Sequence, residues 1–174
     1  MPDPVSFASV ALPHLDAAYS LARWLTGSRD EAEDVVQEAM LRALTYYPSF
    51  RGGNARAWVL QIVRNAAYGA LKLKRGLKLV PLGAEVDGSA PIEPVDPGDD
   101  PEAALLRARE RNELERLLDT LPIELREALV LRELQELSYR EIAEVTEAPI
   151  GTVMSRLWRA RRMLVAAAQR GERR

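Results

Sequence analysis

The arginines near the C-terminus are the side chains of this sequence best suited to bind a polyanion. Seven arginines lie between Gly151 and Arg174, against a single acidic residue, Glu172. Guanidinium groups bind phosphate oxygens and guanine edges through paired hydrogen bonds, so this composition favours a nucleic-acid partner. An arginine-rich helix face is also often only a solvated surface, and the charges alone do not separate the two interpretations.

The residues around these arginines predict a helix-turn-helix. Ser138 and Glu141 have the spacing of a capping box, which starts a first helix. Pro149 and Gly151 mark a turn, and a second helix follows from about Thr152. Apolar residues of the second helix recur every three or four positions and share one buried stripe: Val153, Leu157, Ala160 and Leu164. Capping box, turn and basic helix together favour recognition of duplex DNA.

An acidic amphipathic helix is predicted after Ser28, which forms a second capping box with Glu31. Its inner face is predicted to comprise Ala32, Val35, Val36, Ala39, Met40, Ala43 and Leu44, and its outer face Glu31, Glu33, Asp34, Gln37, Glu38 and Leu41. Carboxylates near a helix N-terminus stabilise the helix dipole by about 0.3–1 kcal/mol each. The same face also suits a docking surface, and periodicity does not separate the two interpretations.

A further helix is predicted from Asn54, which caps it, to about Arg75. Its core stripe is predicted to be Trp58, Val59, Ile62, Val63, Ala66 and Ala70, and its exposed row Arg56, Arg64, Tyr68, Lys72 and Arg75. Cations interleaved with an aromatic ring suit single-stranded nucleic acid, although a solvated face is the alternative. Asn65 lies beside this row, where it is either merely tolerated or has a partner for its amide.

The rest of the sequence predicts two small helical domains. A helix over 10–26, interrupted early by Pro13, precedes the two helices above. Residues 77–101 contain five prolines and no helical period, and residues 79–106 hold seven acids without Lys or Arg, which indicates a flexible acidic linker. Helices from Pro101 to about Asp119 and from Pro122 through Leu134, the latter with apolar positions Leu125, Ala128, Leu129 and Leu134, precede the helix-turn-helix. We therefore expect an all-α chain with domains at 1–76 and 102–174.

Several functional classes are disfavoured by what the sequence lacks. It has no cysteine and a single histidine, His14, so we expect neither a metal site nor a cofactor. No phosphate-cradling glycine loop or nucleophile–base constellation is present, so we expect neither enzymatic activity nor a small-molecule substrate. No apolar run approaches the roughly 20 residues that span a bilayer, and no signal peptide is evident, so we expect a cytoplasmic protein that is not inserted in a membrane.

Three segments resemble the bacterial RNA polymerase sigma factors of the small extracytoplasmic-function class. They read EAEDVVQEAMLRAL, YPSFRGGNARAWVLQIVRNAA and LDTLPIELREALVLRELQELSYREIAEVTEAPIGTVMSRLWRARR, in the order and spacing of that family. The likeness covers nearly the whole chain outside the linker. It implies a promoter-specificity subunit that has no enzymatic chemistry of its own.

The resemblance also implies a role for particular residues. The acidic helix would dock on core RNA polymerase through Asp34, Gln37, Glu38 and Leu41. The −10 element would be opened by the region from Phe50 to Asn65, which would hold a flipped base, with contacts from Arg56, Arg64, Asn65, Tyr68 and Lys72. Unpairing and unstacking a base costs a few kcal/mol, which stacking and amide hydrogen bonds in a pocket offset.

The helix-turn-helix would read the −35 duplex of promoter DNA. Its base-facing residues would be Ser155, Trp158 and Arg159, and its phosphate contacts Arg156 and Arg162. Met154 departs from the lysine or arginine of many relatives, which suggests contact with a thymine methyl or no contact. The acidic linker is expected to imitate the nucleic acid that displaces it, and an anti-sigma protein is an expected partner.

One alternative from another class is a dimeric helix-turn-helix regulator, whose N-terminal helices would form a dimerisation or effector domain. It predicts tight binding of the free protein to palindromic operators with half-sites one helical turn apart. The acidic helix and the basic-aromatic row favour the sigma-factor interpretation, because a dimeric regulator needs neither.

Overall fold

The computed structural model describes residues 6–77 and 100–171, and within these ranges it contains helices and no strands, which confirms the all-α expectation. Residues 6–77 are called the N-terminal half below, and residues 100–171 the C-terminal half. Most of the predicted linker, with the acids Glu85, Asp87, Glu93, Asp96 and Asp99, lies outside the described residues.

Three long helices build the N-terminal half. Its elements are α1 (Phe7–Ala11), the 3₁₀ turn η1 (Leu12–His14), α2 (Leu15–Thr26), α3 (Arg29–Tyr46), the 3₁₀ turn η2 (Tyr47–Ser49) and α4 (Ala55–Leu77). Pro13 interrupts the first predicted helix at η1, and α2 ends at Gly27, whose φ of 76° is left-handed. Helices α2, α3 and α4 pack against one another in pairs.

The predicted N-terminal caps of α3 and α4 are present. Ser28 accepts a hydrogen bond from the Glu31 amide, and Asn54 Oδ1 accepts one of 3.0 Å from the Ala57 amide. Two predicted core positions are wrong, since Leu44 is 53% exposed and Ala70 is exposed. Leu44 follows buried Ala43 by one residue, a turn of about 100° that carries it off the buried stripe.

The C-terminal half places a helix-turn-helix on a shorter helix. Its elements are α5 (Pro101–Asp119), α6 (Ile123–Leu129), a π-helical turn η3 (Val130–Leu134), α7 (Tyr139–Thr146) and α8 (Ile150–Gly171). Leu125, Ala128 and Leu129 are buried as predicted, but Leu134 is 45% exposed. The π turn, closed by the Gln135 amide on the Val130 carbonyl at 3.1 Å, breaks the helical period on which the prediction for Leu134 rested.

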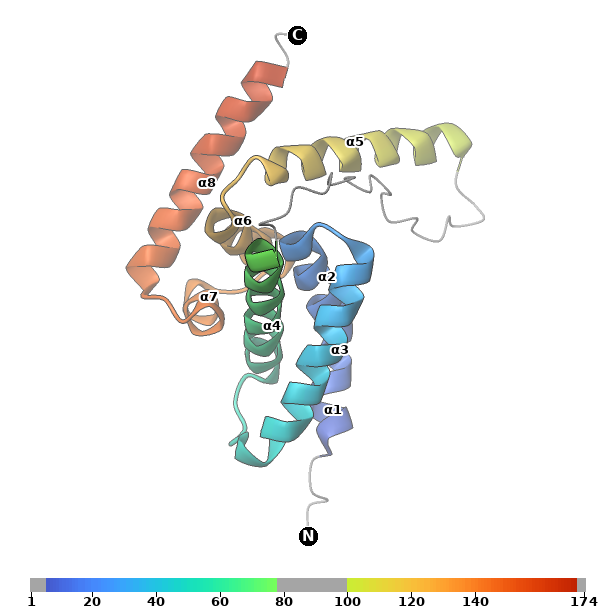
Figure 1. The fold of residues 1–174 in the computed structure, drawn as a ribbon. Coiled ribbons are helices and arrows are strands. Elements are labelled where there is room, and N and C mark those ends of the chain that lie inside the picture. The colour runs from blue at the N-terminus through green and yellow to red at the C-terminus, as the bar shows by residue number, and fades with distance from the viewer. Residues whose placement is uncertain (1–5, 78–99, 172–174) are drawn as a thin grey trace.

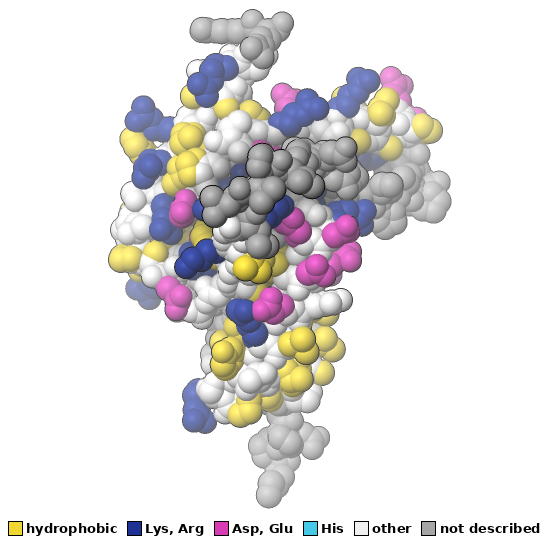
Figure 2. Space-filling view, in the orientation of Figure 1, with side chains coloured by type: hydrophobic (Ala, Val, Ile, Leu, Met, Phe, Trp, Pro, Cys, Tyr) yellow, Lys and Arg dark blue, Asp and Glu magenta, His cyan; other side chains and the backbone are white. Residues whose placement is uncertain are grey.

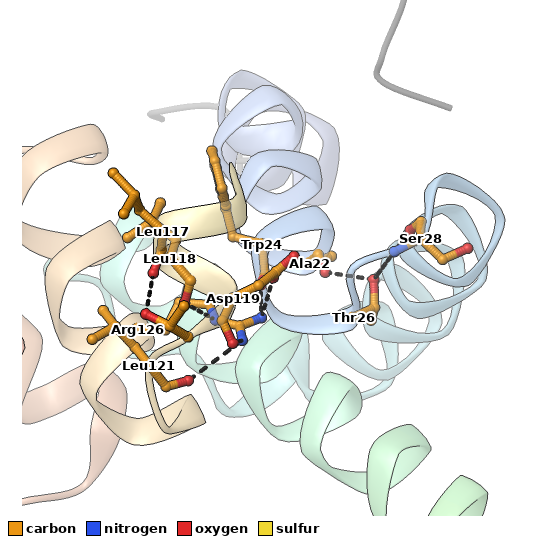
Figure 3. Close-up of polar contacts among 10 residues, drawn as sticks. Ala22, Trp24, Thr26, Ser28, Leu117, Leu118, Asp119, Leu121 and Arg126 are labelled. Carbon is orange, nitrogen blue, oxygen red and sulfur yellow. Dashed lines mark hydrogen bonds and ion pairs between the residues drawn. The ribbon is translucent and has the colours of Figure 1, made fainter. Parts of the chain in front are cut away.

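Arg126 of α6 ties the start of the C-terminal half together. Its guanidinium donates to the carbonyls of Leu118 at 3.0 Å, Asp119 at 3.2 Å and Leu121 at 3.4 Å, which lie at and after the end of α5 (Figure 3). It also donates to the carbonyl of Trp24 in α2 at 3.3 Å. One side chain thus satisfies carbonyls left free after α5 and reaches the N-terminal half.

The two halves pack against each other along α4 (Figure 1). Helix α7 lies on α4, and α6 lies on α2, while α5 and α8 extend outward. Buried residues of both halves, among them Leu60, Val63, Leu131 and Ile142, belong to one hydrophobic cluster. In this arrangement, the helices predicted to form separate domains share a core.

Candidate nucleic-acid interface

The predicted helix-turn-helix is present, with both partners of its capping box engaged. Ser138 Oγ accepts from the Glu141 amide at 3.2 Å, and Glu141 Oε2 accepts from the Ser138 amide at 2.7 Å. The bond from the Ser138 backbone lowers the pKa of Glu141 below its usual value, with a further contribution from the Ser138 side chain. Helix α7 ends at Thr146, the following Glu147 has a left-handed φ of 52°, and α8 begins at Ile150.

Helix α8 buries three of the four predicted stripe residues, leaves Leu164 half-buried, and presents a basic face to solvent. Val153, Leu157 and Ala160 are buried. Ser155, Arg159 and Arg162 are exposed, and Trp158 is 58% exposed, with the Arg162 guanidinium 4.7 Å from its ring centroid. These four predicted site residues therefore lie on an accessible face, and Trp158 is not a core residue.

Arg156 differs from the other arginines in the first half of α8. It is half-buried, and its NH1 atom is buried without a hydrogen-bond partner within the described part of the chain. Its positive charge lies close enough to lower the pKa of Glu127 of α6, so it faces inward as well as outward. A buried guanidinium nitrogen without a hydrogen-bond partner is unfavourable.

The acidic face of α3 is exposed as predicted. Asp34, Gln37 and Glu38 are exposed, and Leu41 is 67% exposed. Glu38 forms an ion pair with Arg42 one turn later. Figure 2 shows Asp and Glu side chains gathered beside the upper part of α3, whereas Lys and Arg follow the edge formed by α8. Exposed carboxylates next to an exposed leucine can complement a protein surface that is basic and partly apolar.

The basic row of α4 is where the structure departs most from the sequence prediction. Lys72 and Asn65 are exposed, but the Arg64 side chain is only 16% exposed, and Arg56 and Tyr68 are half-buried. The prediction of a wholly exposed row is therefore wrong. The reason is that the C-terminal half covers this side of α4, a contact that the periodicity of α4 alone does not indicate.

Glu127 is the buried acceptor at the centre of this contact. Its side chain is fully buried and accepts from Arg64 Nε at 2.6 Å and from Tyr68 Oη at 3.1 Å. Burial raises the pKa of Glu127, and Arg64 and Tyr68 oppose that shift by bonding its charged form. Burial also raises the pKa of Tyr68, with the Glu127 charge as the next cause. The Arg64 guanidinium lies 4.3 Å from the Tyr68 ring centroid, so the three groups form one cluster.

Two more hydrogen bonds join polar groups of α4 and its cap to the C-terminal half. Arg56 NH2 donates to Gln135 Oε1 at 2.9 Å, and Asn54 Nδ2 donates to Glu141 Oε1 at 2.6 Å. Gln135 is only 4% exposed. Sequence reasoning did not identify Glu127, Gln135 or Glu141 as partners of α4, since their contacts join residues 63, 79 and 87 positions apart.

A pocket of about 500 Å³ lies at the start of α4. Its lining includes Phe50, Asn54, Trp58 and Gln61 of the N-terminal half and Glu144 of α7. The rings of Phe50 and Trp58 are 4.7 Å apart, so the pocket has an aromatic wall and polar amides. The glycine turn before Asn54, in which Gly52 and Gly53 have positive φ, is the sequence signal for a loop here. No sequence signal indicates that Glu144 faces it.

Other kinds of site are not found in residues 6–77 and 100–171. This part of the chain contains no group of three or more acidic or histidine side chains placed to hold a metal ion. None of its helices is both long and apolar enough to span a bilayer.

Two family models match the two halves. Sigma-70 region 2 matches residues 11–76, and Sigma-70, region 4 matches residues 111–164. RNA polymerase sigma-H factor of Pseudomonas aeruginosa is 36% identical over 80% of this chain and 74% of its own length. ECF RNA polymerase sigma factor SigE of Mycolicibacterium smegmatis is 31% identical over 91% of this chain, which spans 60% of that longer relative.

A solved structure of similar fold is that of the sigma factor RpoE from Bartonella quintana in complex with the anti-sigma factor NepR. It is 29% identical, covers 91% of this chain and 93% of its own, and has a TM-score of 0.71. Since the match extends over both halves, that sigma factor has a similar arrangement of the helices that correspond to the two halves.

Proposed function

This chain belongs to the sigma-70 family of RNA polymerase sigma factors, in its extracytoplasmic-function class, and we propose which of its surfaces carry each step of promoter recognition. Its function is to direct the initiation of transcription. The observation that carries the proposal is that an exposed acidic helix lies in the region 2 half and an exposed basic recognition helix in the region 4 half. The dimeric operator-binding regulator is not favoured, because region 2 has no part in such a protein.

The acidic face of α3 docks on core RNA polymerase. Asp34, Gln37 and Glu38 supply charge and hydrogen-bond acceptors, and exposed Leu41 supplies an apolar contact at the same surface. Carboxylates of this kind attract a basic partner over several ångströms and fix the register of the complex. The N-terminal position of these acids in α3 adds the smaller benefit of stabilising the helix dipole.

The α4 surface and its pocket engage the −10 element as a single strand. The pocket lined by Phe50 and Trp58 receives an unstacked base, with the amides of Asn54 and Gln61 available for its edge. Arg56, Arg64, Asn65, Tyr68 and Lys72 follow along α4, where cations and a ring suit a backbone and its bases.

The exposed face of α8 reads the −35 duplex in the major groove. Ser155, Trp158 and Arg159 approach the base edges, and Arg156 and Arg162 bind phosphates. Arg162 is stacked on Trp158 in this structure, which keeps both side chains in defined positions. Two separate DNA contacts of this kind specify a promoter when the polymerase holds them at a fixed spacing.

We propose core RNA polymerase, promoter DNA and an anti-sigma protein as the partners. The similar RpoE chain is bound to the anti-sigma factor NepR, which supports the last of these. The chain acts in the cytoplasm, as a specificity subunit and not as an enzyme, since nucleotide chemistry belongs to the polymerase.

Transcription in vitro with purified core polymerase on a genomic fragment library tests this function. We expect start sites preceded by a shared pair of motifs that appear only when the chain is added. Start-site selection that does not change on addition of the chain, together with tight binding to inverted-repeat operators as a dimer, would contradict the proposal.

A further inference from the structure

Arg161 is an arginine of α8 whose guanidinium is bonded inside the C-terminal half. Its NH2 atom donates to Oε1 of Glu133, in the π turn η3, at 2.9 Å. Neighbouring Arg159 and Arg162 are exposed and have no ion pair with any residue that the structure describes. The arginines of α8 therefore do not all offer the same free charge to a polyanion.

The position of Arg161 borders the face of α8 that is proposed to enter the major groove. Arg161 follows Trp158 by three residues and Met154 by seven, so helical geometry places the three side chains in one row. Met154 and Trp158 are 53% and 58% exposed. A row at the side of a groove-reading face points toward the phosphates that border the groove, where an arginine binds without regard to sequence. A free guanidinium at this position would add such a contact.

The scaffold before α8 holds Glu133 in place. The neighbouring Arg132 donates from NH1 to the Leu137 carbonyl at 2.8 Å, and its guanidinium lies 5.2 Å from the ring centroid of Tyr139. Tyr139 also acts on Arg161, because the raised pKa of Arg161 has the Glu133 bond as its first cause and Tyr139 as the next. The π turn is thus fixed to the start of α7 and presents its carboxylate to α8.

We propose that Glu133 is a positioning residue that withholds Arg161 from DNA phosphates and so limits the sequence-independent affinity of α8 for duplex DNA. A guanidinium binds phosphate best through two parallel donors, and the Glu133 carboxylate already occupies the NH2 of Arg161. Phosphate contacts supply most non-specific binding to DNA. With one contact withheld, α8 depends more on the polymerase to hold it at a promoter. This inference rests on the proposed binding of the −35 duplex by α8.

The test measures binding of the full chain to a mixed-sequence double-stranded DNA oligonucleotide by fluorescence anisotropy, over a series of salt concentrations. Glu133→Gln is compared with Glu136→Gln, which makes the same change of net charge at an exposed position three residues later. We expect Glu133→Gln to bind about threefold more tightly at low salt, with a slope of log K against log salt about 0.9 steeper, as for one more phosphate contact. Glu136→Gln should leave the slope unchanged.

A double-variant comparison shows whether Glu133 acts through Arg161. In a chain that carries Arg161→Gln, addition of Glu133→Gln should give no gain in affinity and no change of slope. A gain that persists there would mean that Glu133 only repels phosphates by its own charge, and weaker binding by Glu133→Gln alone would mean that it orients Arg161 toward DNA. Either result would overturn the proposal. Since the two side chains are 54% and 49% exposed, their ion pair contributes little to stability, and circular dichroism should show intact helices in every variant.

Arg162→Ala separates failure of this inference from failure of the proposed function. Arg162 is a proposed phosphate contact, so its loss should weaken duplex binding and make the slope about 0.9 shallower. If Arg162→Ala has this effect and Glu133→Gln changes nothing, the role of Glu133 is refuted and α8 remains the duplex-binding helix. If neither substitution changes binding, or no variant binds the duplex at low salt, the assignment of α8 to the −35 duplex fails, and the role of Glu133 fails with it.

Discussion

The two surfaces proposed to bind DNA differ in how exposed their side chains are in this structure. On α8, Ser155, Trp158, Arg159 and Arg162 face solvent on a helix whose position is fixed within its own half. On α4, Arg64 and Tyr68 are bonded to Glu127 of the other half. The face proposed for the −35 duplex is thus exposed in this structure, whereas two of the groups proposed for the −10 strand are bonded within the chain.

This difference matches what each proposed kind of contact requires. Duplex recognition needs a rigid helix and exposed side chains, and α8 provides both on its own scaffold. Binding of a single strand needs aromatic rings and cationic side chains. Such groups bind many polyanions when they are exposed to solvent. In this structure, two such groups, Arg64 and Tyr68, are bonded to the internal carboxylate of Glu127.

The largest expected effect is the loss of association with core polymerase, on which both proposed DNA contacts depend. Asp34→Arg combined with Glu38→Arg reverses two exposed charges of α3, and like-charge contact with a basic partner costs several kcal/mol. We expect loss of association with core polymerase on a sizing column, without a change in thermal unfolding. The neutral pair Asp34→Asn and Glu38→Gln should give an intermediate loss. Normal assembly of the double arginine variant would refute the docking surface.

The next prediction compares the free energy of unfolding of two variants, one on the covered surface of α4 and one on the open surface of α8. Arg64→Ala leaves the fully buried carboxylate of Glu127 without its cation, a change that typically costs about 3–5 kcal/mol. We expect either a lower free energy of unfolding by that amount or, if the halves separate instead, a longer distance between spin labels attached to them. Arg159→Ala, at an exposed position, is the matched control and should change neither quantity. Equal stability of the two variants would remove the difference between the surfaces.

Arg159→Ala has its own effect, on sequence selection. We expect a loss of about 1–3 kcal/mol in promoter binding by the holoenzyme, confined to one base pair of the −35 element. Binding to a set of promoters with single base changes at each −35 position measures this. Uniform weakening across all of them would show that Arg159 contacts only phosphate.

The open surface was predictable from the sequence, because its signals are local. The Ser138–Glu141 capping box, the turn at Pro149 and the stripe of Val153 and Leu157 each involve residues a few positions apart. Once the stripe is fixed, helical geometry fixes the opposite face. The same reasoning applies to α3, where Glu33, Asp34 and Glu38 are exposed as predicted, although Glu31 is half-buried.

The covered surface was not predictable, because its determinants are distant in sequence. Glu127 reads locally as an ordinary helical glutamate, and only its contact with Arg64 shows it to be a buried acceptor. Inward-facing Arg156 had the same local pattern as its exposed neighbours. Polar residues buried by contact between two halves carry no apolar period, so hydrophobic patterning assigns them to solvent.

A smaller effect concerns the step of initiation at which each surface is proposed to act, either formation of the closed promoter complex or promoter opening. Asn65 is exposed beside Arg64, whose NH1 donates to its Oδ1 at 3.3 Å. Loss of one hydrogen bond to an unstacked base is worth about 1 kcal/mol, so Asn65→Ala should slow promoter opening by roughly fivefold. Formation of the closed promoter complex should be unaffected, whereas Arg159→Ala should weaken it. Rapid-mixing measurements of both steps test this, and equal effects of Asn65→Ala on both would contradict its role.

The smallest expected effect concerns the N-terminal cap of α7, the helix that precedes the recognition helix α8. Ser138→Ala removes the side-chain half of the capping box of α7 and should lower the free energy of unfolding by about 1 kcal/mol.

The pKa of Glu141 is lowered in the folded chain. The contribution of Glu141 to the free energy of unfolding is therefore present above its unfolded pKa, near 4.5, and is lost as the pH falls through the folded pKa. Denaturant titrations at neutral pH and near pH 3 should therefore show wild-type stability falling with Glu141 protonation. Because α7 also lies against α4, a loss much greater than about 1 kcal/mol would mean that the cap supports the interface with α4 as well, and that the two surfaces are less independent than their exposure suggests.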